Sequence, residues 1–178
     1  MVRSEELARG LQDLDVRWND GMSPREAAAL EQGLATLPVR MERFNANARL
    51  VADALSRHPA VGRLYFNGLP SHRSHATAQR ILGGPSGVMS FTLARDGLEA
   101  LRAFYDSPMP GITKEPSLGS DRTLLCPYTL LTHYHETDEA LAAIGLPRYL
   151  VRVSVGCEPD VGPVIECLER ALGAAGGP

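Results

Sequence analysis

The sequence predicts an α+β fold: a small mixed, mainly antiparallel sheet with helices packed on one face, preceded by long N-terminal helices. Two observations favour this class. Short runs of strand-forming residues alternate with helical periodicity after residue 60. None of these runs carries the glycine fingerprint of a dinucleotide-binding βαβ unit, so a doubly wound parallel sheet is not expected.

The N-terminal part of the chain reads as helix. Residues 4–13 place leucines at helical spacing. Ser23, with a proline after it and Glu26 three residues later, is a typical helix start with a capping box. We expect Pro38 to kink or break this helix, because proline lacks the backbone N–H that a helix interior needs. A second helix is then predicted over residues 39–57.

The rest of the chain alternates between the two periodicities, with glycine and proline as punctuation. These boundaries define an N-terminal helical segment (1–37), an α+β domain (38–173) and a disordered tail (174–178). The predicted strands cover residues 61–66, 88–93, 109–113, 123–126 and 149–155, and the predicted helices cover residues 72–82, 98–105, 136–144 and 160–172.

Composition narrows the range of functions. The net charge is −3, so nothing favours binding to nucleic acid or to an anionic membrane. The chain has three cysteines, an odd number at wide spacing, which argues against a disulfide framework or a zinc site. A reducing compartment is the simplest interpretation, so we expect a cytoplasmic protein.

Arg152 is the most informative single residue. Period-2 alternation places Val151 and Val153 on one face of a strand and Arg152 on the other. A guanidinium beside apolar strand positions requires a partner, and the usual partner is a carboxylate bound through two hydrogen bonds. Two interpretations stay open: an internal Asp or Glu pairs with Arg152, or Arg152 binds the carboxylate of a substrate.

Several short motifs, in order along the chain, resemble the C-terminal part of the Cys/Met-metabolism enzymes that use pyridoxal phosphate. That family includes cystathionine synthases and lyases, methionine γ-lyase and homoserine-ester sulfhydrylases. The motifs are SP at 23–24, GLATL at 33–37, RMERFNANA at 40–48, GLPSH at 68–72 with His75, SGVMSF at 86–91, SLG at 117–119, TL at 123–124, TH at 132–133 and LVRVSVGCE at 150–158.

The resemblance implies roles for two residues. The family's matching arginine binds the α-carboxylate of the amino-acid substrate, which assigns that role to Arg152. The serine before Leu-Gly lies beside the substrate in the family and its backbone helps to hold the carboxylate, which assigns Ser117 to the same site. From the residues alone, a loop serine that bonds its own backbone is the favoured interpretation of Ser117. The family implies beta or gamma elimination or replacement at a sulfur-containing or homoserine-type amino acid, as in a C–S lyase or a transsulfuration synthase.

The cofactor motif of the family is absent from this sequence. The Schiff-base lysine of the family lies in a motif of the form S-x-T-K-Y, and the single lysine here, Lys114, lies three residues before Ser117, in a different region. No compact glycine-rich phosphate loop opens a helix. We therefore expect no catalytic residue in this chain, and cofactor binding only together with a partner chain that carries the N-terminal, pyridoxal-phosphate-binding half.

Two functional hypotheses follow. The first is that this is the C-terminal subunit of a split pyridoxal-phosphate enzyme, active as a hetero-oligomer with that partner. The alternative is a non-catalytic binding or assembly module derived from the family. Pro116 favours the alternative weakly, because many γ-synthases and γ-lyases have glutamate at that position, so γ chemistry does not transfer to this chain.

The remaining polar motifs are interpreted as structural. Thr132 and His133 resemble a turn that closes the family's site, and Glu158 is expected to cap or pair near the next helix. His72 and His75 could meet the later histidines in a metal site, but no cysteine or carboxylate cluster completes the set, so no metal is predicted.

Overall fold

The structure is a computed structural model that describes residues 4–18 and 21–176 of the 178-residue chain. The chain divides into two compact units, residues 1–38 and residues 39–178, and each is described by itself. The family resemblance assigns the first segment, residues 1–37, to the edge of a larger domain, and this assignment stays a prediction.

The N-terminal unit is helical. It contains α1 (Glu5–Trp18) and the beginning of α2 (Pro24–Arg57), so the first helix extends beyond the predicted residues 4–13. No residue of α1 is buried, and its leucines are exposed. At the start of α2, the Ser23 N–H donates to Glu26 Oε2 (2.8 Å) and the Glu26 N–H donates to Ser23 Oγ (3.3 Å), which confirms the predicted capping box.

Helix α2 continues through Pro38, so the helix does not break there, and the helix predicted over residues 39–57 is the continuation of α2. The other expected outcome, a kink at Pro38, stays a prediction. A proline removes one backbone hydrogen bond, but the turns on either side keep theirs. The capping box stabilises the start of the helix. Its later turns are held by packing, since Phe44, Ala48 and Val51 are buried. These gains offset the loss of a single bond.

The second unit contains a five-stranded sheet in the order β1-β2-β5-β4-β3. Three of the four strand pairs are antiparallel, and only β3 and β4 pair in parallel. The predicted mixed, mainly antiparallel sheet is confirmed. The strands are β1 (Val61–Tyr65), β2 (Val88–Leu93), β3 (Thr113–Lys114), β4 (Leu124–Pro127) and β5 (Val151–Ser154).

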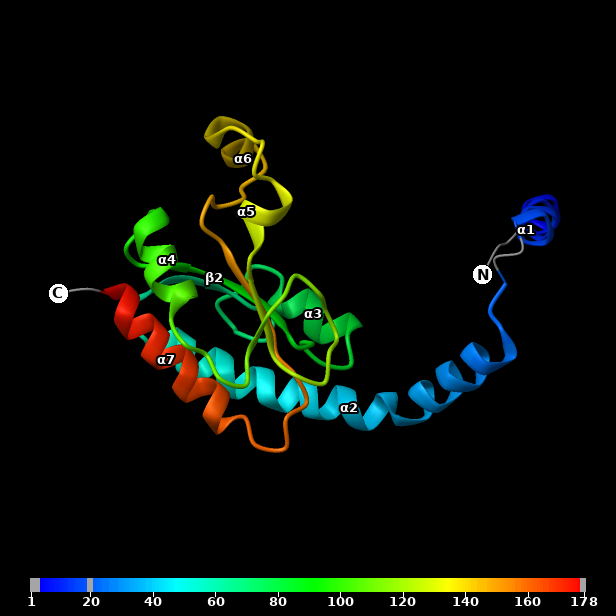
Figure 1. The fold of residues 1–178 in the computed structure, drawn as a ribbon, viewed down its shortest axis with the longest axis horizontal. Helices are drawn as coiled ribbons and strands as arrows, with labels where there is room; N and C mark the ends of the chain where they lie inside the picture. The colour runs from blue at the N-terminus through cyan, green and yellow to red at the C-terminus, as the bar shows by residue number, and fades with distance from the viewer. Residues whose placement is uncertain (1–3, 19–20, 177–178) are drawn as a thin grey trace. The chain divides into compact units, whose positions relative to one another are not determined.

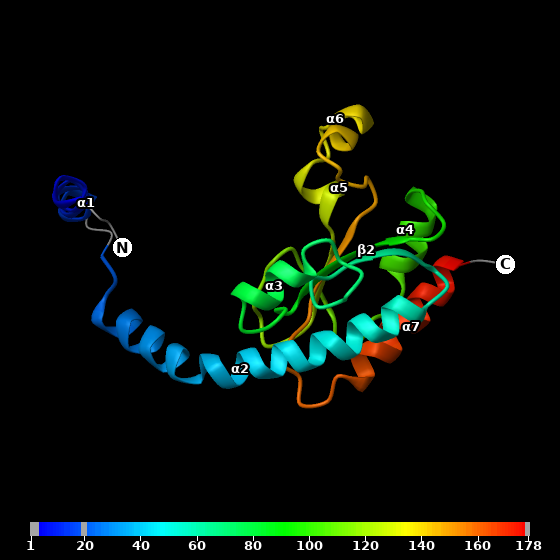
Figure 2. The same cartoon turned by 180° about the vertical axis from the view of Figure 1, so that it is seen from behind.

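One face of this sheet carries the hydrophobic core. The later turns of α2, together with α4 (Leu98–Asp106) and α7 (Gly162–Gly176), cover that face (Figures 1 and 2). Phe91 on β2 meets Phe104 on α4 edge to face, with ring centroids 5.6 Å apart. Val151 and Val153 of β5 are fully buried on the same side. The opposite face, which carries Arg152, is called the open face below.

The shorter helices differ from their predicted bounds. Residues 69–74 form hydrogen-bonded turns, so the helix predicted over residues 72–82 starts later. A short helix after β4 was not predicted, because five residues are too few to show a helical period. The helix predicted over residues 136–144 is shorter at both ends. These helices are α3 (His75–Ile81), α5 (Tyr128–Thr132) and α6 (Asp138–Ala143).

The prediction of a disordered tail from residue 174 is wrong for residues 174–176. Helix α7 passes Gly173 and ends at Gly176, with Ala175 buried in the core. A Cβ on Gly173 would meet no other atom, so this glycine was not placed there for a tight turn. Packing of Ala171, Leu172 and Ala175 continues the helix beyond it. The last two residues of the predicted tail, 177–178, lie outside the described residues.

Candidate functional site

Arg152 lies at the centre of the open face. It pairs with Ser90 on β2 and with Cys126 on β4, and both pairs are antiparallel. Directly opposed residues of antiparallel strands project from the same face, so Arg152 shares its face with polar Ser90. Tyr65 on β1 is the partner of Ser90 in turn. A half-buried guanidinium therefore lies inside a row of side chains that crosses four strands, β1, β2, β5 and β4.

The guanidinium of Arg152 is held by backbone, not by an acid. Its Nη2 donates to the carbonyl oxygens of Pro116 (2.6 Å) and Ser117 (3.0 Å). Within residues 4–18 and 21–176, no Asp or Glu forms an ion pair with Arg152. Its Nε is buried and has no hydrogen-bond partner. Of the two interpretations that the sequence left open, pairing of Arg152 with an internal Asp or Glu is therefore not seen in the described part of the chain. The guanidinium keeps unused capacity to bind an acid.

Tyr128 is a member of the site that was not predicted from the sequence. It begins α5, and the Arg152 guanidinium carbon lies 5.4 Å from the centre of its ring, within the range of a cation–π interaction. The ring of His133, the residue that follows α5, lies 6.0 Å from the Tyr128 ring. The available signal was the position of Tyr128, two residues after the strand predicted over residues 123–126.

Ser117 lies in an exposed loop and reaches Arg152 through its backbone carbonyl. The loop is connected to β5 a second time, because the Gly119 N–H donates to Ser154 Oγ (3.4 Å). Gly119 has a φ of 75°, a left-handed conformation that glycine adopts without a Cβ penalty. The structure thus brings Ser117 and Arg152 together, as the resemblance implied, while their role toward a substrate stays a prediction.

Glu158 has a different role from the one expected. Its Oε1 accepts a hydrogen bond from the Thr123 N–H (2.5 Å), and the Thr123 hydroxyl accepts one from the Gly156 N–H (3.0 Å). The helix-capping prediction for Glu158 is not what the structure shows, since Asp160 Oδ1 accepts from the Gly162 N–H at the start of α7. Glu158 therefore joins the end of β5 to the start of β4. A Cβ at Gly156 would lie 2.5 Å from Asp121 O, which explains the glycine at this close approach.

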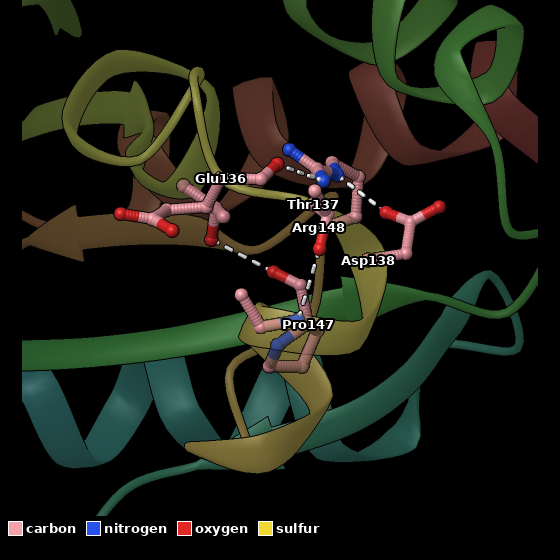
Figure 3. A network of polar contacts seen from close by, with 7 residues as sticks. Glu136, Thr137, Asp138, Pro147 and Arg148 are labelled. Carbon is pink, nitrogen blue, oxygen red and sulfur yellow. Dashed lines mark hydrogen bonds and ion pairs between the residues drawn. The ribbon is translucent and has the colours of Figure 1, made fainter.

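Arg148, four residues before Arg152, is fully engaged (Figure 3). Its Nε donates to Asp138 Oδ1 (2.7 Å) and its Nη2 donates to the Glu136 carbonyl oxygen (2.6 Å). The neighbouring Pro147 carbonyl accepts from the Thr129 hydroxyl (2.7 Å). These bonds join the segment before β5 to helices α5 and α6, and so they help to place Tyr128 at the start of α5 beside Arg152.

The Thr132–His133 pair is local to the end of α5. The Thr132 hydroxyl lies 2.9 Å from the Tyr128 carbonyl oxygen and 2.7 Å from His133 Nδ1. His72 and His75 are also in local contacts: His72 Nδ1 accepts from the Ser74 N–H, and His75 Nδ1 lies 2.9 Å from the Asn67 carbonyl oxygen. In the described part of the chain, no three His, Cys, Asp or Glu side chains come together as metal ligands would.

Lys114 does not join the site. It lies on β3, where its Nζ donates to the Ser107 carbonyl oxygen (3.3 Å) and lies 4.9 Å from the centre of the Tyr105 ring. Cys126, the strand neighbour of Arg152, has its thiol pKa raised by burial, an effect that the Arg152 charge opposes in part, so it is a thiol rather than a thiolate at neutral pH. The described residues thus include an arginine without an acid partner, but no lysine beside it.

Comparison with known proteins gives the family. The family model described as "Cys/Met metabolism PLP-dependent enzyme" matches residues 1–173. The chain belongs to this family. It is 34% identical to the L-methionine gamma-lyase of Pseudomonas putida over 154 residues, and 34% identical to the cystathionine gamma-lyase of Mus musculus over 174 residues. These alignments cover 86% and 98% of this chain, but only 38% and 43% of the two relatives.

A solved structure agrees with this assignment. The cystathionine gamma synthase of Xanthomonas oryzae pv. oryzae, in complex with cystathionine, matches with a TM-score of 0.86 and 34% identity. The match covers 99% of this chain and 45% of that one. The chain therefore spans less than half the length of these relatives, and the predicted α+β fold is that of a domain in this family of enzymes.

The family depends on pyridoxal phosphate, and two features of the chain bear on whether the described residues could bind this cofactor. Lys114 is away from Arg152, and Gly83-Gly84, the one glycine pair in the described domain, precedes strand β2 instead of a helix. The described residues therefore do not fit the cofactor by themselves.

No helix among residues 4–18 and 21–176 is long and apolar enough to cross a membrane.

Proposed function

We propose that this chain supplies the substrate-carboxylate site of a pyridoxal-phosphate-dependent enzyme of sulfur amino-acid metabolism. A partner chain would carry the N-terminal half, with the Schiff-base lysine and the phosphate-binding groups. The reaction would be a beta or gamma elimination or replacement, in line with the lyase and synthase names of the relatives. The cofactor would supply the electron sink, and this chain would supply orientation and specificity.

The observation that carries this proposal is the state of Arg152. A half-buried guanidinium with no acid partner among the described residues, and with a buried Nε that bonds nothing, is costly unless a ligand completes it. An α-carboxylate is an anion of the right geometry for a planar guanidinium. The carbonyls of Pro116 and Ser117 and the Tyr128 ring hold the guanidinium in place, which lowers the entropy cost of binding.

The proposal includes assembly of this chain with its partner as a hetero-oligomer in the cytoplasm. The cysteines Cys126, Cys157 and Cys167 are all free, in keeping with a reducing compartment. In the N-terminal unit, the leucines of α1 and the Trp18 side chain are exposed, which suits a surface that a partner covers.

The proposal is tested by co-expressing this chain with the polypeptide proposed to carry the N-terminal half. The complex is purified on a tag carried by this chain, and its absorbance is recorded. We expect stoichiometric co-purification and the visible absorption of a lysine-bound cofactor, while this chain alone stays colourless. A Schiff base formed by the chain alone at Lys114 would disprove the split arrangement, as would a colourless complex.

A non-catalytic binding or assembly module is a second candidate, favoured by one observation. The Pro116 and Ser117 carbonyls accept both hydrogen bonds of Arg152 Nη2, so part of the guanidinium is already satisfied without a substrate. This candidate predicts that an amino-acid ligand raises the thermal stability of the chain but that no turnover occurs with any partner present.

A further inference from the structure

A cavity in the second unit lies along the free edge of β1. Its volume is about 700 Å³, inside the range of roughly 300–1,000 Å³ that is typical of small-molecule sites. Its walls come from the end of α2, strand β1, the turns over residues 69–74 and the end of α6. Its lining includes Tyr65, at the β1 end of the open-face row, but none of the residues that contact Arg152, namely Pro116, Ser117 and Tyr128.

The charge of this cavity differs in sign from that of the whole protein. The chain carries 21 acidic and 18 basic residues, yet the lining residues include Arg63, Arg73 and His72 and no Asp or Glu. Within residues 4–18 and 21–176, neither arginine forms an ion pair. The acid nearest in sequence to the lining residue Ser56 is Asp53, and it is paired with Arg57 at 2.7 Å. Neither arginine of the cavity is therefore neutralised by an ion pair within the described residues.

The donors of the cavity are oriented by local contacts. The Arg63 guanidinium carbon lies 4.9 Å from the centre of the Tyr65 ring, two residues along the same strand. His72 Nδ1 accepts a hydrogen bond from the Ser74 N–H, so in the neutral ring the proton is on Nε2, which is a donor. Two arginines, an imidazole N–H and the hydroxyls of serines in the same wall are the groups that recognise oxyanions.

The strand edge itself is not suited to an added peptide strand. The pairing of β1 with β2 shifts register between Val61 and Arg63, which is a bulge. Gly62 stands inside it, where a Cβ would lie 2.8 Å from the Leu93 carbonyl oxygen. A bulge and a charged residue are devices that protect an edge against strand addition. The occupant is therefore expected to be a small molecule and not an extended peptide.

We propose that this cavity is a binding site for a small organic oxyanion, a phosphate ester or a multiply charged carboxylate, separate from the amino-acid site. This inference does not rest on the proposed enzymatic function. It can be tested on the full chain without partner or cofactor, so its failure and the failure of the proposed function are distinguishable.

The test is isothermal titration of the full chain with inorganic pyrophosphate at low ionic strength. We expect saturable binding at one site, weakened about tenfold or more in the double variant Arg63→Gln, Arg73→Gln. The matched control is Arg102→Gln, since Arg102 is an exposed arginine of α4 outside the cavity, and its affinity should stay within about twofold. Thermal unfolding of each variant checks that the fold is kept.

The proposal would be overturned if neither pyrophosphate nor citrate bound saturably to the folded chain. It would also be overturned if Arg102→Gln lost as much affinity as the double variant, because that would mean general charge screening. A titration with citrate separates the two ligand sources. Tighter binding of pyrophosphate identifies phosphate esters as the ligand class, and tighter binding of citrate identifies carboxylates. Binding of an acidic peptide together with no binding of either small anion would also contradict the proposal.

Discussion

The two faces of strand β5 have opposite roles, and they alternate residue by residue. Val151 and Val153 are fully buried against the helices, whereas Arg152 between them lies half-buried on the open face. The valines contribute the free energy of burial, while Arg152 costs free energy unless it is hydrogen-bonded. One strand therefore separates the buried core from the open face by a step of a single residue.

A second comparison concerns two arginines in the same region. Arg148 has a carboxylate partner in Asp138 and a carbonyl partner in Glu136, and it joins helices α5 and α6 to the segment before β5. Arg152 has only carbonyl partners and the Tyr128 ring. The difference indicates that Arg148 is structural, and it leaves Arg152 as the arginine available to a ligand.

The largest expected effect is on substrate affinity. In the reconstituted complex, Arg152→Ala should weaken binding of the amino-acid substrate by about 2–5 kcal/mol, because a desolvated charge pair loses one partner. The measurement is the substrate concentration dependence of the absorbance change and of turnover. Arg102→Ala, at an exposed arginine of α4 that contacts none of these residues, is the matched control, and substrate affinity should stay within about twofold. Unchanged kinetics in Arg152→Ala would mean that this arginine is structural as well.

The next effect concerns the buried face of the same strand. Val153→Ala should lower the free energy of unfolding by about 1–3 kcal/mol, because two buried methyl groups are lost and a cavity remains. Urea unfolding of the full chain measures this change. Ser90→Ala, on the open face, should stay within about 0.5 kcal/mol of the wild type. Equal destabilisation by both variants would contradict the assignment of the two faces.

A smaller effect is expected at the Tyr128 ring. Tyr128→Leu removes the cation–π contact with Arg152 and should weaken substrate binding about two- to fivefold, from roughly 0.5–1 kcal/mol. Tyr128→Phe keeps the ring and should restore most of that affinity. If Phe and Leu behave alike, the phenol hydroxyl and not the ring face is what matters at this position.

The smallest effect lies outside both faces, at the start of α2. Hydrogen bonds from Ser23 lower the pKa of Glu26 in the folded helix. A lowered pKa contributes stability above the usual glutamate pKa, and this contribution is lost as the pH falls through the folded pKa. Far-UV circular dichroism between about pH 6 and pH 3 should therefore show fraying of this helix start in the wild type. Glu26→Gln should show a weaker pH dependence, and identical curves would mean that the capping box adds nothing measurable.

The N-terminal unit and the sheet also differ in how much of their structure local sequence patterns predict. The capping box at Ser23 and Glu26 depends on residues three apart, so the sequence predicted it correctly. The absence of a break at Pro38 depends on contacts that are not local, because the buried residues that stabilise the later turns of α2 pack against strands more than 30 residues away. Helix α5 was missed because five residues do not contain a full pattern.

The sequence by itself determined the α+β class, the capping box and the face on which Arg152 lies, because periods of 2 and 3.6 residues are local properties of a chain. Only the tertiary structure decided what surrounds that arginine. Its carbonyl partners at Pro116 and Ser117 come from a loop 35 or 36 residues earlier. Tyr128 comes from α5, a helix that the sequence pattern did not predict. The cationic cavity likewise unites segments from α2 to α6. Such contacts depend on how the elements pack. Packing brings together residues that no regular spacing in the sequence relates to one another.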